Sequence, residues 1–354
     1  MIVSRTPFRI SFFGGGTDYP GWYREHGGAV LATTIDKYCY LTCRFLPPFF
    51  EHRYRIVYSF IERVATLDEL KHPAAREVLR FMNLPYGVEV HHDGDLPARS
   101  GMGSSSAFTV GLLHALHALK GAMPTKHQLA MESIHLEQEV LKETVGSQDQ
   151  VLAAYGGLNH VTFLTNGEIS VRPMTISRDR TAQLDSHLML LYTGIKRTAS
   201  DVAKSYVNDI DSKKRQLRIM RDLVEEAVGL LNSKHDLAGF GKLLHEAWQA
   251  KRSLSSAVTN SDVDAIYEAA RSAGALGGKL TGAGGGGFML LFAPPERHAA
   301  IREKLNKLLW VPFQFDVNGS QIIFYDPGED YSAAEADRAA KNIEAFKELD
   351  HGAA

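Results

Sequence analysis

The sequence has few cysteines and almost no excess of either charge. The only two cysteines, Cys39 and Cys43, lie four positions apart in a strand-like stretch. We expect both on one face as reduced packing residues, because two thiols alone are too few for a zinc site. Lys and Arg number 39 against 41 Asp and Glu, a formal net charge of −2. This balance argues against nucleic acid as a partner, since such proteins are usually strongly basic.

Long hydrophobic runs are also missing. No stretch approaches the roughly 20 apolar residues that a membrane-spanning helix requires. The N-terminal residues "MIVSRTPFRISFFGGG" do not have the apolar core and small-residue cleavage site of a secretory signal. We therefore expect a cytoplasmic protein without a membrane partner, and the sequence leaves its oligomeric state open.

The order of predicted elements indicates the fold class. A chain of 354 residues exceeds one typical core, which favours two domains. The pattern predicts two strands within residues 28–46 with a break near Asp36, helices over 107–120 and 125–143, and a hairpin turn at Asn166-Gly167. Because strands and helices mix irregularly, we predict an α+β fold rather than a doubly wound sheet.

Glycine is abundant, with 31 residues, and it concentrates in three segments. In the second, "DLPARSGMGSSSAF" (95–108), a glycine turn runs directly into a predicted helix. Its backbone N–H groups and the positive end of the helix dipole suit a phosphate. Ser104, Ser105 and Ser106 add hydroxyls for phosphate oxygen or Mg²⁺. The plainer alternative is a serine cap after a glycine turn.

The other two segments differ in their surroundings. "KLTGAGGGGFMLLF" (279–292) contains a formal G-x-G-x-x-G, but a strand follows it where a dinucleotide fold needs a helix, which argues against a nicotinamide oxidoreductase. The plainer alternative for this segment is a tight glycine turn that leads into a strand. In "PFRISFFGGGTDYP" (7–20), Asp18 follows a glycine turn, where a carboxylate can accept hydrogen bonds from sugar hydroxyls. An Asx-type turn is the alternative there.

In this order, the three segments resemble the motifs of the GHMP kinase superfamily, with Met102 in place of the usual leucine. The resemblance covers nearly the whole chain. It implies a two-domain fold: an N-terminal domain (1–170) like the second domain of ribosomal protein S5, carrying the ATP phosphate loop, and a ferredoxin-like C-terminal domain (171–354). The active site would lie between them, and ATP and Mg²⁺ would be the cofactors.

The resemblance also implies roles for individual residues. Asp149 would be the catalytic base, and Arg9 beside it would favour its ionised form. Glu137 and Ser105 would bind Mg²⁺, although the neighbouring serines leave the register open. The residues implied to bind the nucleotide are Ser100, Gly101, Met102, Gly103, Ser104, Ser105, Ser106 and Gly284. Those implied to bind the sugar are Gly15, Gly16, Thr17, Asp18 and Arg197.

Simpler interpretations of the charged residues remain open. Glu137 is also readable as a solvated helix charge, Asp149 as a helix cap and Arg9 as a charge at a strand edge. A chain with these motifs but without the base or the metal ligand would be a non-catalytic sugar and ATP sensor. An RNA-binding protein built on the S5-like domain is a further alternative, which the near-neutral charge disfavours.

The first segment bears on the substrate. Gly15 and Gly16 stand where galactokinases have Glu and His, so the segment more closely resembles kinases that phosphorylate D-glycero-D-manno-heptose 7-phosphate at the anomeric hydroxyl. A free sugar of the L-fucose or galactose type is the alternative substrate. A substrate that already carries a phosphate needs a second cationic site. The candidates for it are Lys37, Arg53, Arg55, Lys196 and Arg197.

Overall fold

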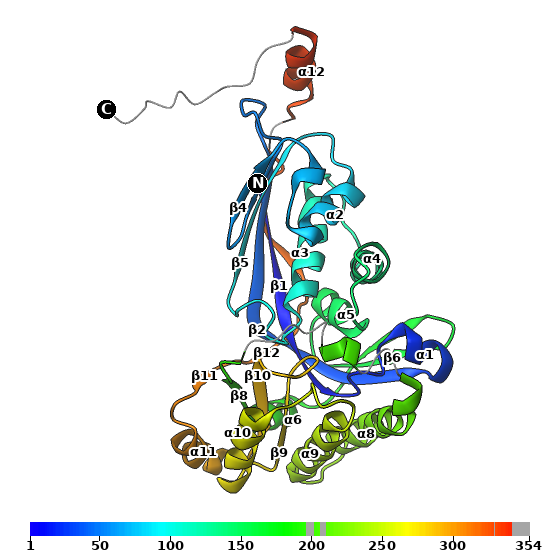
Figure 1. Cartoon of the computed structure of the whole chain (residues 1–354), viewed down its shortest axis with the longest axis vertical. Helices are drawn as coiled ribbons and strands as arrows, with labels where there is room; N and C mark the ends of the chain where they lie inside the picture. Colours follow the sequence, from blue (N-terminus) through cyan, green and yellow to red (C-terminus); the bar gives the residue numbers. More distant parts are fainter. Residues whose placement is uncertain (196–201, 206–209, 329, 342–354) are drawn as a thin grey trace.

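The computed structural model describes residues 1–195, 202–205, 210–328 and 330–341. Within them the chain forms an elongated molecule with a large sheet above and a smaller sheet with its helices below (Figure 1). The resulting architecture is the predicted α+β class. Among the described residues, no helix combines the length and the apolar character needed to cross a membrane.

The larger sheet has nine strands within the described residues. Its main path runs β13-β1-β2-β5-β3-β4, and β6, β7 and β12 join at its lower end. The strands are β1 (Ile2–Phe13), β2 (Gly28–Phe45), β3 (Tyr54–Val57), β4 (Ile61–Val64), β5 (Val88–Gly94), β6 (Asn159–Phe163), β7 (Ile169–Pro173), β12 (Phe315–Asp316) and β13 (Gln321–Tyr325).

Strand β2 corrects one prediction. Residues 28–45 form one continuous strand, not two with a break near Asp36. Its register against β1 shifts between the Pro7↔Tyr38 and Arg9↔Thr34 pairs, so extra residues of β2 bulge out at this point. A bulge bends a strand and increases its twist without ending it. The polar residue near the middle of the run therefore marks a bend rather than a turn.

Helices cover one face of the large sheet. They are α2 (Pro73–Met82), α3 (Ser104–Leu119), α4 (Lys126–His135) and α5 (Gln148–Tyr155). Helix α3 is buried along most of its length, as its nearly uniform apolar sequence predicts. Gly111 allows it to approach β1 closely, because a Cβ there would lie 2.8 Å from Thr6 Oγ1. Thr125 caps the N-terminus of α4, since its hydroxyl accepts a hydrogen bond from the Gln128 amide at 3.1 Å.

The smaller sheet has the order β11-β8-β10-β9. Its strands are β8 (Leu188–Tyr192), β9 (Gly277–Leu280), β10 (Phe288–Phe292) and β11 (Leu309–Val311). The helices of this lower half are α6 (Arg178–Ser186), α8 (Lys214–Asn232), α9 (Ala238–Arg252), α10 (Ser261–Ser272) and α11 (His298–Lys304). Helix α12 (Ser332–Lys341) lies at the opposite tip of the molecule (Figure 1).

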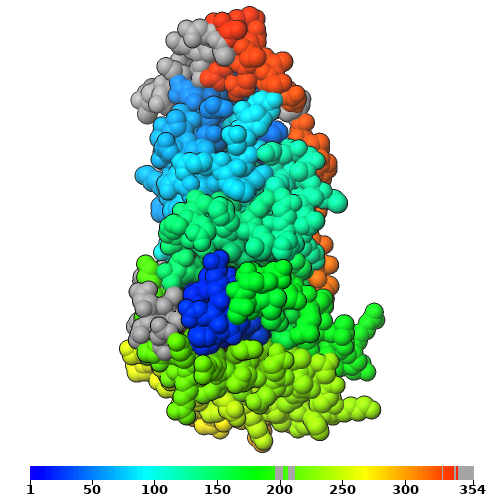
Figure 2. Space-filling model, turned by 90° about the vertical axis from the view of Figure 1, so that its right-hand side faces the viewer, coloured from blue at the N-terminus to red at the C-terminus, as the bar shows by residue number. Residues whose placement is uncertain are grey.

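The two halves are tied together by the chain path. The division at residue 170 stays a prediction: β7 spans it, and β12 and β13 return from the C-terminal half to pair with β2 and β1. Helix α1 (Pro20–His26) lies at the surface directly above α8 and α9 (Figure 2). Arg221 of α8 donates to the carbonyl of His26 at 3.3 Å. The smaller features predicted from the sequence hold, since the two free cysteines are buried and β6 and β7 pair across Gly167.

Candidate active site

An arginine and a carboxylate meet where the two halves join. Arg9, on β1, is almost fully buried and binds Asp149 through two hydrogen bonds of 2.7 Å, one to each carboxylate oxygen. A third bond of 2.7 Å runs from Arg9 to the carbonyl of Gly101. The Asp149 side chain is 25% exposed. The structure therefore brings together the two predicted residues and leaves the carboxylate accessible to a reactant.

Asp149 lies in the first turn of α5. The positive end of the helix dipole favours a negative charge at this position. The turn that leads into α5 is held by Asp18, whose backbone carbonyl accepts from the Ser147 amide at 2.9 Å and whose Oδ2 accepts from the Gln148 amide at 3.3 Å. The first glycine segment thus fixes the position of Asp149.

Asp18 itself is buried. Its Oδ1 accepts from the Gly16 amide at 2.9 Å, and burial together with the nearby charge of Asp149 raises its pKa. The Thr17 hydroxyl is also buried, and it donates to the carbonyls of Gly14 and Ala29. Both side chains have backbone partners, and their role in binding the sugar stays a prediction. Gly15 is the one glycine of this turn that is partly exposed.

The second glycine segment forms a loop that ends at the N-terminus of α3. Gly101 and Gly103 have φ values of +81° and +76°, a region that side-chain-bearing residues rarely adopt. The Met102 side chain is fully buried, and its carbonyl accepts from the Arg9 amide at 3.1 Å. Arg9 therefore connects the loop to Asp149. The exposed N–H groups of a helix start suit a phosphate anion.

The third glycine segment supports this loop from below. A Cβ on Gly101 would lie 2.7 Å from the Thr281 carbonyl oxygen, and one on Gly282 would lie 2.6 Å from the Gly101 Cα. The Phe288 amide donates to the Ser100 carbonyl at 3.3 Å. Gly284, which was predicted to bind the nucleotide, packs against Val258. The segment thus contacts the phosphate loop by close backbone packing.

This packing makes a prediction for Gly101. Gly101→Ala should destabilise the protein by roughly 1–3 kcal/mol, because a left-handed alanine is strained and its methyl would overlap Thr281. It should also raise KM for ATP. Gly229→Ala is the matched control: Gly229 lies in α8 with no atom within 4 Å of an added Cβ. Thermal unfolding and ATP titration of both variants test this, and an unaffected Gly101→Ala protein would contradict the packing argument.

Glu137 lies at the centre of a buried polar group. It follows α4 in a turn of π-helix over Leu136–Val140, a form that often marks functional sites. Its Oε2 accepts from the Ser106 hydroxyl at 2.8 Å and from the side-chain amide nitrogen of Gln150 at 2.5 Å. Within the described part of the chain, its Oε1 is buried without a hydrogen-bond partner. Burial raises the pKa of Glu137 to about 7.

The three serines at the start of α3 differ in their surroundings. Ser105 is exposed, whereas Ser106 is buried against the Glu137 carboxylate, and the role of Ser105 at the metal stays a prediction. The Ser104 hydroxyl accepts from the Arg99 amide at 3.2 Å. Successive residues on a helix point about 100° apart, so one position decides which hydroxyl faces Glu137. Gln150, the residue after Asp149, joins the same group and was not predicted.

Two further residues not predicted from the sequence are buried lysines behind the arginine. Lys279 donates to the Phe12 carbonyl at 3.0 Å, and Lys251 donates to the carbonyls of Leu280 and Gly282. Burial and neighbouring positive charge lower both pKa values, that of Lys279 to about 7. Lys279 opens the third glycine segment, which was a usable signal. Lys251 lies within an amphipathic helix, where no local sequence pattern distinguishes it from an exposed charge.

The candidates for a substrate phosphate that the structure describes lie in different parts of the large sheet. Lys196 and Arg197 lie outside the described residues. Lys37 pairs with Asp36 at 2.9 Å beside a hollow of about 280 Å³. Arg53 and Arg55 project from the far part of the large sheet, next to and on β3.

Comparison with known proteins identifies the family. The family model described as GHMP kinases N terminal domain matches residues 66–157, and the one described as GHMP kinases C terminal matches residues 220–309. Together they span just over half of the chain, in the expected order. The chain belongs to the GHMP kinase family. The resemblance noted in the sequence is thereby confirmed, and with it the two-domain GHMP kinase fold.

Individual GHMP kinases are similar over most of the chain. A D-glycero-alpha-D-manno-heptose 7-phosphate kinase from Campylobacter jejuni is 29% identical over 86% of this chain and 93% of its own length. An L-fucokinase/L-fucose-1-P guanylyltransferase from Bacteroides fragilis is 27% identical over 87% of this chain and 36% of its own. The crystal structure of a D-glycero-D-manno-heptose 1-phosphate kinase from Bacteroides thetaiotaomicron superposes with a TM-score of 0.75 at 23% identity, covering 92% of this chain and 99% of that one.

Proposed function

We propose that this GHMP kinase transfers the γ-phosphoryl group of ATP to the anomeric hydroxyl of D-glycero-D-manno-heptose 7-phosphate, giving the 1,7-bisphosphate. The observation that carries the kinase chemistry is the Arg9–Asp149 pair, held against the loop that begins α3. The choice of sugar is supported by the name and the near-complete overlap of the Campylobacter relative.

The residues present can perform this reaction. Phosphoryl transfer depends mostly on positioning and charge stabilisation. Asp149 accepts the proton of the attacking hydroxyl, and the two bonds from Arg9 orient its carboxylate. The loop over residues 100–104 and the start of α3 hold the ATP phosphates through backbone N–H groups. Lys251 and Lys279 hold the backbone behind the site in place through their hydrogen bonds to its carbonyls.

The Glu137 group fits a Mg²⁺ ion. Its buried Oε1 without a partner is an oxygen ligand of the type that Mg²⁺ prefers. We propose that Glu137 and a serine of the first α3 turn hold the ion. Ser106 is favoured over Ser105 because its hydroxyl contacts the Glu137 carboxylate. When bound, Mg²⁺ would neutralise charge on the ATP phosphates. Among the described residues, no three His, Cys, Asp or Glu side chains gather to bind a metal, so phosphate oxygens would complete its shell.

The proposed compartment is the cytoplasm, which the two free thiols of Cys39 and Cys43 support. The proposed partners are the sugar phosphate and ATP.

A substrate panel tests the proposal. ADP release should be measured with Mg²⁺ and ATP against free heptoses, L-fucose and galactose, and against heptose phosphates that carry the phosphate at C1 or C7. We expect turnover with the 7-phosphate and incorporation of the new phosphate at C1. Turnover with free sugars alone would assign a free-sugar kinase instead. ATP binding without turnover of any sugar would assign a sensor.

A further inference from the structure

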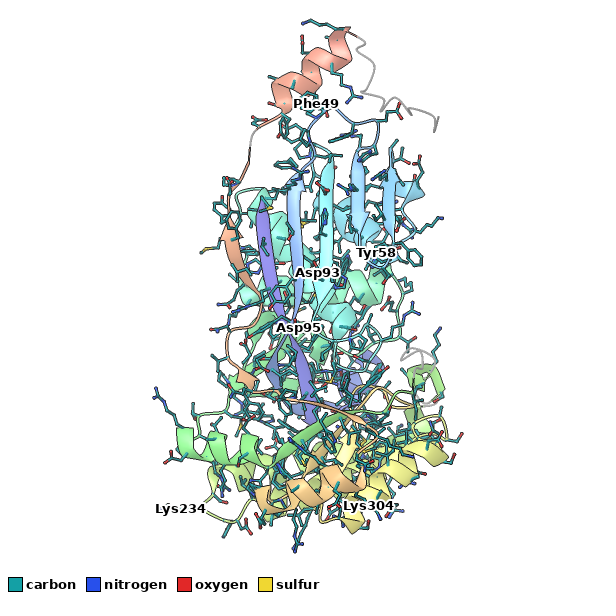
Figure 3. All side chains as sticks on the ribbon, turned by 90° about the vertical axis from the view of Figure 1, so that its left-hand side faces the viewer. Phe49, Tyr58, Asp93, Asp95, Lys234 and Lys304 are labelled. Carbon is teal, nitrogen blue, oxygen red and sulfur yellow. The ribbon has the colours of Figure 1, made fainter. Side chains whose placement is uncertain are left out.

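The face of the large sheet opposite its helices carries a row of charged residues. Figure 3 views the molecule from this side, with the strands in front of α2 and α3. Four residues are direct neighbours across four adjacent strands, in the registers Arg44↔Glu89, Arg55↔Glu89 and Arg55↔Arg63. Directly paired residues point to the same face. We call these residues the arginine row: Arg44 of β2, Glu89 of β5, Arg55 of β3 and Arg63 of β4.

Glu89 orients two of the arginines. Its carboxylate is 3% exposed and accepts from Arg44 Nε and Arg55 Nη1, each at 2.6 Å. His91 adds a contact of 2.9 Å. The arginine side chains remain 47% and 30% exposed. A guanidinium has five N–H donors, and each of the two arginines donates one hydrogen bond to Glu89. The carboxylate therefore orients both guanidinium groups and leaves their other N–H donors available to a ligand.

The third arginine leaves the row with an excess of positive charge. Arg63 is exposed and, within the described ranges, has no ion-pair partner, although it lies directly opposite Arg55. Like charges at directly opposed positions destabilise a sheet. Burial and the charges of Arg63 and Arg55 lower the pKa of the neighbouring His52, while Glu89 and Glu51 act in the opposite direction. The row therefore has three positive charges and one negative charge, and a bound anion would reduce the repulsion among the arginines.

The row borders a hollow large enough for a small molecule. A groove of about 500 Å³ lies between this end of the sheet and α12. Arg53 and Ala65 continue the same face of the sheet beyond Arg55 and Arg63, and they line the groove. Its other lining residues include Phe50, Glu51, Glu335 and Arg338. The groove can hold the remaining part of a ligand whose anionic group lies at the row.

The arginine row is remote from the proposed active site. Arg9 pairs with Thr34 on β2, and Arg44 lies ten positions further along that strand. At about 3.3 Å per residue the separation is roughly 30 Å. Arg55, which the sequence allowed as a ligand of the substrate phosphate, is therefore too far from Asp149 for that role.

We propose that the arginine row is a second anion site, which binds the phosphate or diphosphate group of a small phosphorylated metabolite. Arginine suits this ligand because its planar donors match two phosphate oxygens at once. The site goes beyond the proposed kinase activity and is independent of it.

Pyrophosphate binding tests the proposal. The full chain, saturated with a non-hydrolysable ATP analogue to occupy the kinase site, is titrated calorimetrically with inorganic pyrophosphate at constant ionic strength. We expect one saturable site and a raised Tm. Arg63→Met should weaken binding about tenfold or more, the effect of losing a charge-assisted contact. It should fold normally, since Arg63 has no partner among the described residues.

Arg178→Met is the matched control, because Arg178 is likewise exposed but begins α6. It should bind pyrophosphate as the wild type does. Kinase turnover should be unchanged in both variants, so a failure here differs from a failure of the proposed function. The site does not exist if the ATP-saturated wild type binds no pyrophosphate, or if Arg63→Met binds it as tightly as the wild type. Equal weakening by Arg178→Met would reduce the effect to general charge and overturn the proposal as well.

Discussion

Asp149→Asn should lower kcat by about 10²–10⁴-fold, the range typical of losing a general base, while ATP binding stays unchanged. The amide has nearly the shape of the carboxylate and keeps one acceptor for Arg9, but it offers no site for the proton of the sugar hydroxyl. Since Arg9 is almost fully buried, the loss of its anionic partner should also lower Tm. Steady-state ADP release, equilibrium ATP titration and thermal unfolding measure the three effects.

The matched control is Asp179→Asn. Asp179 is exposed in the first turn of α6, as Asp149 is placed in the first turn of α5, so the two substitutions remove the same charge from equivalent helix positions. The control should leave kcat within about twofold of the wild type, because Asp179 is not among the residues proposed to contact the substrates and an exposed substitution seldom changes stability. Wild-type turnover in Asp149→Asn would show that the carboxylate only holds Arg9 in place.

The Arg9–Asp149 pair shows what the sequence can and cannot predict about the site. These residues are 140 positions apart, and no local pattern predicts their contact. The prediction came from three ordered motifs, each of which alone is also compatible with a plain turn. The motifs do not predict which way each serine side chain points from the helix. Any of the three serines in "GSSSA" satisfies the pattern, and only the folded helix places Ser106 against Glu137.

Tertiary contacts account for the remaining differences. Thr17 and Asp18 look available for a ligand in sequence, yet the backbone of the same turn and of α5 uses both. Lys251 reads as one charge of an amphipathic helix, and its burial follows from the carbonyls of the third glycine segment facing it. The return of β12 and β13 to the large sheet depends on long-range pairing, which no local signal predicts.

Glu137→Gln should raise the Mg²⁺ concentration needed for half-maximal turnover by at least the roughly 10–100-fold that losing a supporting group of a metal site costs. In the wild type, the requirement should also depend on pH. Burial raises the pKa of Glu137 to about 7, and Mg²⁺ binds the carboxylate form, so the apparent affinity for Mg²⁺ should fall as the pH drops below about 7. The Gln variant should lack this dependence. Mg²⁺ titrations of ADP release at several pH values measure both effects.

Stability without metal provides the control for Glu137→Gln. The folded-state pKa of Glu137 lies above its ordinary value of 4.5, so between about pH 4.5 and 7 the native state binds more protons than the unfolded state. The free energy of unfolding therefore falls as pH rises through this window. At pH 8 without Mg²⁺, the Gln variant should be at least as stable as the wild type, which separates loss of the ligand from loss of the fold.

The serines complete this test. Ser106→Ala removes the hydroxyl that donates to Glu137, whereas Ser105→Ala removes an exposed one from the same helix turn. If the ion lies at the Glu137 group, Ser106→Ala should shift the Mg²⁺ requirement in the same direction as Glu137→Gln, and Ser105→Ala should shift it less. The reverse order would place the metal-facing hydroxyl at Ser105. An unchanged requirement in Glu137→Gln would remove the ion from this carboxylate and leave its buried, unpartnered oxygen without a ligand.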